Sequence, residues 1–267
     1  MSKEQTPKKQ LEILVVEDNS KHLADAHEVA GTYMNIKFTY AETLVEAEAA
    51  IQQNRFDAVV TDAFFPADKS AEPEGNVAVL APLLLERSIP YVINTAGNHH
   101  GKRFEQLRLP DCNRENLSGA VIEAYPEEIN AEMDTKQWEA AINYATLIAN
   151  ADYLGARTIE VGNLLPPSTY GEYGQFTGVF QALLERGKSP EETITKAKQL
   201  TYGGMNFEEL LKERAYHLLT GRRASGYVPE WIALNDSQKD ELTETARGHY
   251  FEALELIRQT IGSYKEA

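Results

Sequence analysis

Short apolar segments alternate with amphipathic ones along the first half of the chain, beginning at Leu11. The first apolar segment, LEILVV, is continuous, as is typical of a strand buried on both faces of a sheet. The intervals between the segments are long enough for the crossover helices that parallel strands require. The pattern therefore predicts an α/β fold around a parallel sheet, with strands at residues 11–16, 36–41, 56–61, 89–95 and 119–124.

Helical periodicity fills most of the intervals between these strands. In one of them, apolar side chains recur every three or four residues while the glutamates fall on the other face. In another, Asp134 and Gln137 form a plausible capping pair ahead of an apolar stripe. Pro82 lies near the first turn of a third, or marks a kink in it. Helices are predicted at residues 43–53, 76–88, 101–109 and 133–151.

Beyond residue 150 the alternation of strands and helices ends. Residues 153–178 are rich in Gly, Pro and Tyr, which predicts an ordered connector. Start and stop signals then mark three helices, beginning at a capping box over residues 189–192, at Asn206, and at Asp236 or Ser237. We expect a disordered tail over residues 1–10, an α/β domain over 11–150, and a connector with a helical region over 151–267.

Charge and composition narrow the classes of partner. The formal net charge is -15, and acidic residues outnumber basic ones in both halves of the chain. Because affinity for nucleic acid depends on cations that displace phosphate counterions, this balance disfavours nucleic acid as a partner. No apolar stretch is long enough to span a membrane, and the single cysteine, Cys112, fits a reducing compartment. The sequence therefore predicts a cytoplasmic protein.

Three acidic residues fall where predicted strands end. Glu17 and Asp18 follow the first strand, and Asp62 follows the third. Ligands of open parallel sheets bind at this edge, so the three carboxylates are expected to share a pocket. Crowded carboxylates repel one another unless a cation lies among them, and hard oxygen ligands suit Mg²⁺. The sequence thus predicts a magnesium site.

Three segments, ILVVEDN, DAVVTDAFFP and VINTAG, resemble the signature segments of bacterial response-regulator receiver domains. The separation of Asp18 from Asp62, 44 residues, is usual in that family, and Pro66 lies where receivers usually have proline. The resemblance covers only the N-terminal half. It implies a flavodoxin-like receiver fold, which is a doubly wound five-stranded parallel sheet of order 2-1-3-4-5.

The resemblance also implies roles for individual residues. Glu17 and Asp18 resemble the metal-binding pair, and Asp62 resembles the phospho-accepting aspartate that also contacts the metal. Thr95 resembles the residue whose hydroxyl contacts the phosphoryl group and couples it to a loop rearrangement. Phe64, two residues after Asp62, lies where receivers offer the metal a backbone carbonyl.

Two features depart from the receiver pattern. Receivers carry a lysine at the end of the fifth strand, whereas this chain has Glu123, Ala124, Tyr125 and Pro126 there. Lys102, in the loop after the fourth strand, is a candidate replacement. The loop after the third strand, PADKSAEPEGN, is about five residues longer than is usual in receivers, long enough to cover the pocket or bind a partner.

Two functions stay open from the sequence. In the first, a non-catalytic regulator is phosphorylated on Asp62 with Mg²⁺ bound, by a histidine kinase or a small phosphodonor, and relays its state to the helical region, which contacts a protein partner. In the second, a pseudo-receiver works as a protein-interaction module without phosphorylation. A Toprim-like metal-dependent enzyme is disfavoured, because that family has an Asp-x-Asp where this chain has Asp62, Ala63 and Phe64.

Overall fold

The computed structural model describes residues 7, 9–95, 103, 106–110, 119–123, 135–150, 207–220 and 228–265. The chain divides into two compact units. The first unit comprises Met1–Gly155 together with Gln259–Ala267, and the second comprises Ala156–Arg258. The domain limits expected from the sequence stay a prediction, because residues 151–206 lie outside the described ones.

Five parallel strands form the sheet of the first unit, in the order β2-β1-β3-β6-β7. Counted within this sheet alone, the order is 2-1-3-4-5, so the predicted doubly wound α/β fold of the receiver type is confirmed. Its central strands are buried along their length, which explains their continuous apolar runs. The strands are β1 (Leu11–Val16), β2 (Ile36–Ala41), β3 (Ala58–Thr61), β6 (Tyr91–Thr95) and β7 (Ala120–Glu123).

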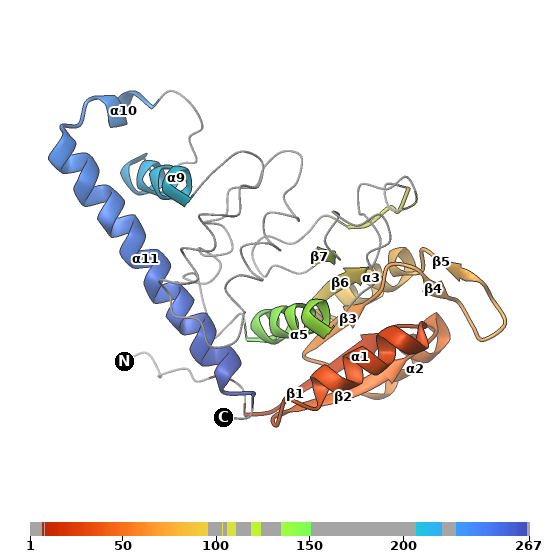
Figure 1. Cartoon of the computed structure of the whole chain (residues 1–267). Helices are drawn as coiled ribbons and strands as arrows, with labels where there is room; N and C mark the ends of the chain where they lie inside the picture. Colours follow the sequence, from red (N-terminus) through yellow and green to blue (C-terminus); the bar gives the residue numbers. More distant parts are fainter. Residues whose placement is uncertain are drawn as a thin grey trace. The chain divides into compact units, whose positions relative to one another are not determined.

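Helices cover both faces of this sheet. Since crossovers between parallel strands are right-handed, the strand order places α1 (Ser20–Ala30) on one face and α2 (Leu44–Gln53) and α3 (Val77–Glu86) on the other. The helix α5 (Thr135–Ala149) packs beside α1 and across β3 and β6 (Figure 1). The predicted helices at 43–53, 76–88 and 133–151 are therefore present.

Local sequence signals explain where these helices start. The side chain of Asn19 accepts a hydrogen bond from the backbone N–H of Lys21 at 2.9 Å, ahead of α1. The side chain of Thr43 accepts one from the N–H of Glu46 at 3.2 Å, ahead of α2.

The helix predicted at 101–109 is wrong at its end, since residues 107–109 are not helical. The proline at position 110 disfavours helical backbone in the residue before it.

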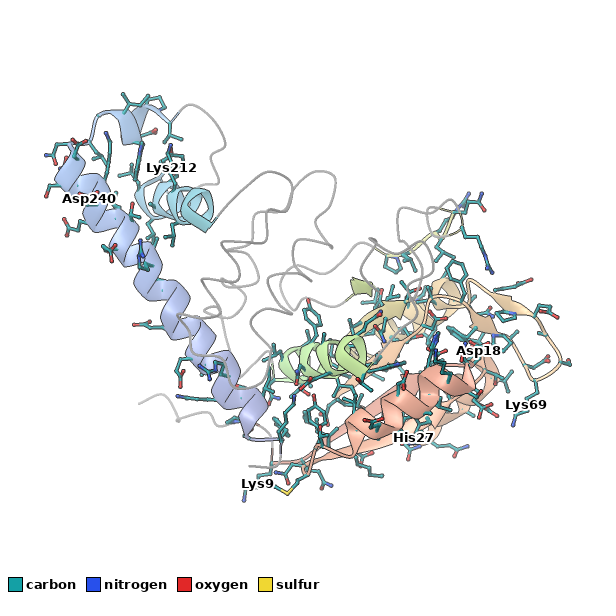
Figure 2. The ribbon with its side chains drawn as sticks, viewed as in Figure 1. Lys9, Asp18, His27, Lys69, Lys212 and Asp240 are labelled. Carbon is teal, nitrogen blue, oxygen red and sulfur yellow. The ribbon has the colours of Figure 1, made fainter. Side chains whose placement is uncertain are left out.

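The long loop after β3 forms a hairpin, made of β4 (Phe65–Pro66) and β5 (Pro73–Glu74). It is tied to the start of α3 by the amide of Asn76, which donates to the carbonyl of Phe65 at 2.6 Å. Its outer loop lies against α2, where Lys69 forms an ion pair with Glu46 at 3.1 Å (Figure 2). Single contacts thus connect this loop to neighbouring helices, while residues 68–74 are exposed.

The second unit is helical where it is described, as the sequence predicts. It contains α9 (Phe207–Thr220), α10 (Pro229–Ile232) and most of α11 (Asp236–Gly262), whose last turn belongs to the first unit. Tyr216 of α9 meets Trp231 of α10 edge to face, with ring centroids 4.8 Å apart. The connector at 153–178 and the helix expected after residue 189 lie outside the described residues. Among the described helices, none combines the length and apolar character that crossing a membrane needs.

Candidate functional site

The three acidic residues singled out in the sequence meet at one edge of the sheet. Val16 and Thr61 are paired across β1 and β3, so the residues that follow them, Glu17 and Asp62, lie side by side. The N–H of Asp62 donates to the carbonyl of Val16 at 2.8 Å, which continues the ladder to this point. One carboxylate oxygen each from Glu17, Asp18 and Asp62 lies within 4.8 Å of the others. The predicted shared pocket is thus formed, with Asp18 beside the start of α1 (Figure 2).

Glu17 has one hydrogen-bonded carboxylate oxygen and one without a hydrogen-bond partner among the described residues. It is 1% exposed, and its Oε1 accepts a hydrogen bond from the N–H of Asn19 at 2.9 Å. The Nδ1 of His22 lies 3.6 Å from the same oxygen. The other oxygen, Oε2, is buried and has no hydrogen-bond partner among the described residues. A buried carboxylate oxygen without a donor is costly, and a cation in the pocket would satisfy it.

Asp62 lies at the centre of the pocket and is half-buried. Its Oδ1 accepts a hydrogen bond from the N–H of Ala63 at 2.6 Å, and its Oδ2 accepts one from the N–H of Phe64 at 3.3 Å. These two bonds orient the carboxylate. A nucleophile needs this kind of fixed and partly accessible placement.

The electrostatics of the pocket favour the neutral forms of the two aspartates. Burial, followed by the charge of Glu17, raises the pKa of Asp62 to about 7, although its two backbone hydrogen bonds oppose the shift. Burial and Glu17 also raise the pKa of Asp18. The neighbouring Glu17 carboxylate raises the pKa of His22 against the opposing effect of burial. In the described part of the chain, His22 is the one basic side chain that pairs with these carboxylates, and it is cationic when protonated.

The donor set fits a hard divalent cation. All three candidate ligands are carboxylates, one has an unsatisfied buried oxygen, and burial together with the charge of Glu17 raises the pKa values of both aspartates. Glu17, Asp18 and Asp62 are therefore the residues that could hold Mg²⁺. The carbonyl of Phe64 as a further ligand stays a prediction.

Thr95 ends β6 at the same edge of the sheet. Thr61 pairs with Ile93 across β3 and β6, so Asn94 and Thr95 extend to the level of Asp62 and beyond it. Both are buried, and both accept a hydrogen bond from the side chain of Gln137. The sequence pattern predicts a helix-capping role for Gln137 and carries no signal for this contact, because nothing in a single sequence pairs a helix residue with a particular strand end.

The position of the missing lysine carries an acidic residue. Glu123 ends β7 and pairs with Thr95 of β6, so it lies on the strand next to Thr95. Lys102, the candidate replacement, lies outside the described residues. The strand pairing thus places Glu123, and not a lysine, beside Thr95 at the end of the sheet.

Comparisons with known proteins give structural neighbours alone. No protein-family model matches the sequence, and no curated protein matches it. The chemotaxis response regulator CheY4 of Vibrio cholerae is similar over 51% of this chain and 98% of its own, with 12% identity and a TM-score of 0.35. Full-length FixJ from B. japonicum is similar over 96% of this chain and 98% of its own, with 11% identity and a TM-score of 0.37. RcsB from Salmonella enterica serovar Typhimurium is similar over 95% of this chain and 93% of its own, with 10% identity and a TM-score of 0.33.

One expectation from the sequence is corrected by these neighbours. The acidic net charge disfavoured nucleic acid as a partner, yet RcsB is bound to the P1flhDC and rprA promoters in two of the similar structures, and to two parallel DNAs in a third. The expectation relied on charge summed over each half of the chain, and such a sum does not report the local grouping of cations on a surface. The acidic balance therefore does not exclude nucleic acid.

Proposed function

We propose that the protein is a signal-transduction regulator whose first unit is a receiver that accepts a phosphoryl group on Asp62. One observation carries the proposal: Asp62 is fixed by two backbone N–H groups beside two further carboxylates, one of which has a buried, unsatisfied oxygen. Glu17, Asp18 and Asp62, with the carbonyl of Phe64, would hold Mg²⁺. When bound, that ion neutralises charge on the carboxylates and on the incoming phosphoryl oxygens.

The residues of the pocket have distinct tasks in this proposal. An oxygen of Asp62 attacks the phosphorus of a phosphohistidine on a kinase, or of a small acyl phosphate. The bond from phosphorus to the donor breaks, its electron pair leaves with the donor, and an aspartyl phosphate forms. The N–H groups of Ala63 and Phe64 keep the carboxylate in place for attack, and the hydroxyl of Thr95 contacts the transferred group. The regulator turns over no other substrate.

Beryllofluoride and acetyl phosphate test the proposal directly. With Mg²⁺ and acetyl phosphate, the intact protein should gain the mass of one phosphoryl group, and the Asp62→Asn variant should not. The Asp68→Asn variant is the matched control, because Asp68 is an exposed carboxylate on the β4–β5 hairpin. Calorimetry with Mg²⁺ and beryllofluoride gives a second readout. Absence of both the mass gain and beryllofluoride binding in the wild type would refute the proposal.

A second function is supported by the residue at the end of β7. Glu123 pairs with Thr95, where a receiver would offer a cation to the phosphoryl group, and an acidic residue there opposes an aspartyl phosphate. Under this alternative the first unit is a pseudo-receiver that holds a protein partner regardless of phosphate. Partner capture would then be unchanged in Asp62→Asn, whereas under the first proposal it depends on Asp62.

A further inference from the structure

The first turn of α5 is hydrogen-bonded to the end of β6 that carries Thr95. The side-chain amide of Gln137 donates to Oδ1 of Asn94 at 2.9 Å and to the carbonyl of Thr95 at 3.0 Å. All three residues are buried, and Gln137 is 4% exposed. Buried polar side chains are costly unless they are hydrogen-bonded, so this contact specifies how α5 sits against the strand end.

Residues 264 and 265 contact α5 near both of its ends. At the far end, Asn150, one residue beyond α5, is hydrogen-bonded to the hydroxyl of Tyr264, and both side chains are buried. Nearer the first turn, Lys265 forms an ion pair with Glu139, and its amine also lies 5.0 Å from the centre of the Tyr33 ring. We call residues 259–265 the C-terminal strap.

The strap is also tied to the turn between α1 and β2. The N–H of Met34 donates to the carbonyl of Tyr264 at 3.0 Å, and Tyr33 and Lys265 form an antiparallel bridge. The hydroxyl of Tyr33 in turn donates to Asn143 on α5 at 2.7 Å. The strap therefore contacts both α5 and the turn that α5 holds.

Both limits of the first unit lie close in sequence to the contact between Asn150 and Tyr264. The chain leaves the first unit at Gly155, five residues after Asn150, and returns at Gln259, five residues before Tyr264. From Gln137 to Asn150 the helix rises by about 20 Å, and a hydrogen-bonded helix of that length moves as a rigid rod.

We propose that α5 couples the acidic pocket to the C-terminal strap, with Gln137 as the positioning residue at the Thr95 end and the Asn150–Tyr264 contact at the other. One part of this inference rests on the proposed function: the event that drives the coupling is the binding of a ligand in the pocket at Asp62. A change at Asn94 and Thr95 shifts the first turn of α5 through Gln137, and the same rigid helix shifts its partners in the strap. Because the strap begins at Gln259, where the chain returns from the second unit, it is the route by which the second unit would be regulated.

The first test needs no ligand. In full-length protein, Gln137→Met keeps the size of the side chain and removes both donated bonds, so amide hydrogen exchange in residues 259–265 should accelerate about five-fold or more. Thr146→Val is the matched control: it removes a buried hydrogen bond within the same helix and should leave the strap unchanged. Equal exchange of the strap in both variants, measured at matched global stability, overturns the coupling.

The second test runs in the opposite direction and covers the case in which Gln137→Met does not fold. Tyr264→Phe removes only the hydroxyl that contacts Asn150. Because coupling between two sites acts in both directions, exchange at Asn94 and Thr95 should also accelerate. If exchange at the end of β6 is unaltered, the coupling is wrong.

The third test separates this inference from the proposed function. Calorimetry first establishes whether wild-type protein binds Mg²⁺ with beryllofluoride. If it binds, strap exchange should change on binding in the wild type and in Thr146→Val but not in Gln137→Met; an unchanged strap in the bound wild type refutes the coupling. If it does not bind, the proposed function fails, and the two ligand-free tests still decide whether α5 couples its ends.

Discussion

Asp62 illustrates how the pocket balances one carboxylate between two states. Its backbone hydrogen bonds favour the charged form, whereas burial and the neighbouring acids favour the neutral one. The second influence is the larger, so the pKa is raised. A cation in the pocket would favour the charged form of Asp62. The charge of single residues in the pocket can therefore be tested by changing the pH or the metal concentration.

The pH dependence of stability should reveal the cost of keeping Asp62 charged in the pocket. Because its pKa rises from 3.8 in the unfolded chain to about 7 in the folded one, the folded state holds its proton longer between these pH values. The metal-free protein should therefore lose stability as the pH rises from about 4 to about 7. Asp62→Asn removes this loss and should be more stable than wild type at pH 8 by about 1–3 kcal/mol, with a smaller difference at pH 5.

Urea unfolding at the two pH values, with EDTA present, measures this difference. Adding Mg²⁺ at pH 8 should stabilise the wild type and not Asp62→Asn. If the difference in the free energy of unfolding between the two proteins is the same at pH 5 and pH 8, the pocket does not raise the pKa of Asp62.

Removal of the unsatisfied oxygen of Glu17 should weaken metal binding. Glu17→Gln replaces a buried carboxylate in the cluster with a neutral amide, so the affinity for Mg²⁺ should fall about ten-fold or more. Titration of Mg²⁺ followed by calorimetry measures the loss, with Asp68→Asn as the control on the exposed hairpin. Equal affinities of Glu17→Gln and wild type would exclude Glu17 as a ligand.

At the scale of elements, the β4–β5 hairpin and α5 make contacts that sequence patterns do not show. The hairpin begins three residues after Asp62 and is fixed to the start of α3. Gln137 and Asn143 of α5, and Asn150 just beyond it, are buried polar residues, and each is hydrogen-bonded to a residue outside the helix. These hydrogen bonds fix α5 against the end of β6, Tyr33 and Tyr264.

The hairpin should be sensitive to the loss of its internal tie. Asn76→Ala leaves the buried carbonyl of Phe65 without this donor, which should lower the free energy of unfolding by about 1–3 kcal/mol. Since Phe64 also donates to Asp62, beryllofluoride affinity should fall as well. Chemical unfolding and calorimetry report the two effects, and Ser70→Ala in the exposed loop should change neither.

At the scale of the whole chain, the first unit is assembled from two distant segments of sequence. Residues 259–265 belong to the same unit as a sheet whose last strand ends more than a hundred residues earlier, and Tyr264, at 1% exposure, is among the largest fully buried side chains. The first unit therefore needs both segments to bury its side chains.

Deletion of residues 259–267 should destabilise the first unit. Loss of the buried ring of Tyr264 alone should lower its stability by about 3 kcal/mol or more, judging from truncations of buried aromatic side chains. Thermal unfolding followed by the fluorescence of Trp138, in a Trp231→Phe background, measures this effect on the unit that holds α5. A protein lacking only residues 266 and 267 is the control, and an unchanged melting temperature in the longer deletion would show that the strap is dispensable.

The sequence by itself determined the approximate positions of the strands, the helices at 43–53, 76–88 and 133–151, and the meeting of Glu17, Asp18 and Asp62. The elements follow from short-range periodicity, and the meeting of the three acids follows from the rule that the carboxyl ends of parallel strands share one edge. The order of the strands was implied only by the resemblance to receivers, and the helix α1 was not predicted. The contacts of Gln137 with β6 and of Tyr264 with Asn150 were decided only by the tertiary structure, because they join residues 42 to 114 positions apart whose side chains carry no periodic signal. The hairpin was visible only as extra length, since its two-residue strands are too short to show alternation. Local pattern thus fixes the elements, whereas hydrogen bonds between distant buried polar groups fix how α5 and the end of the chain close the unit.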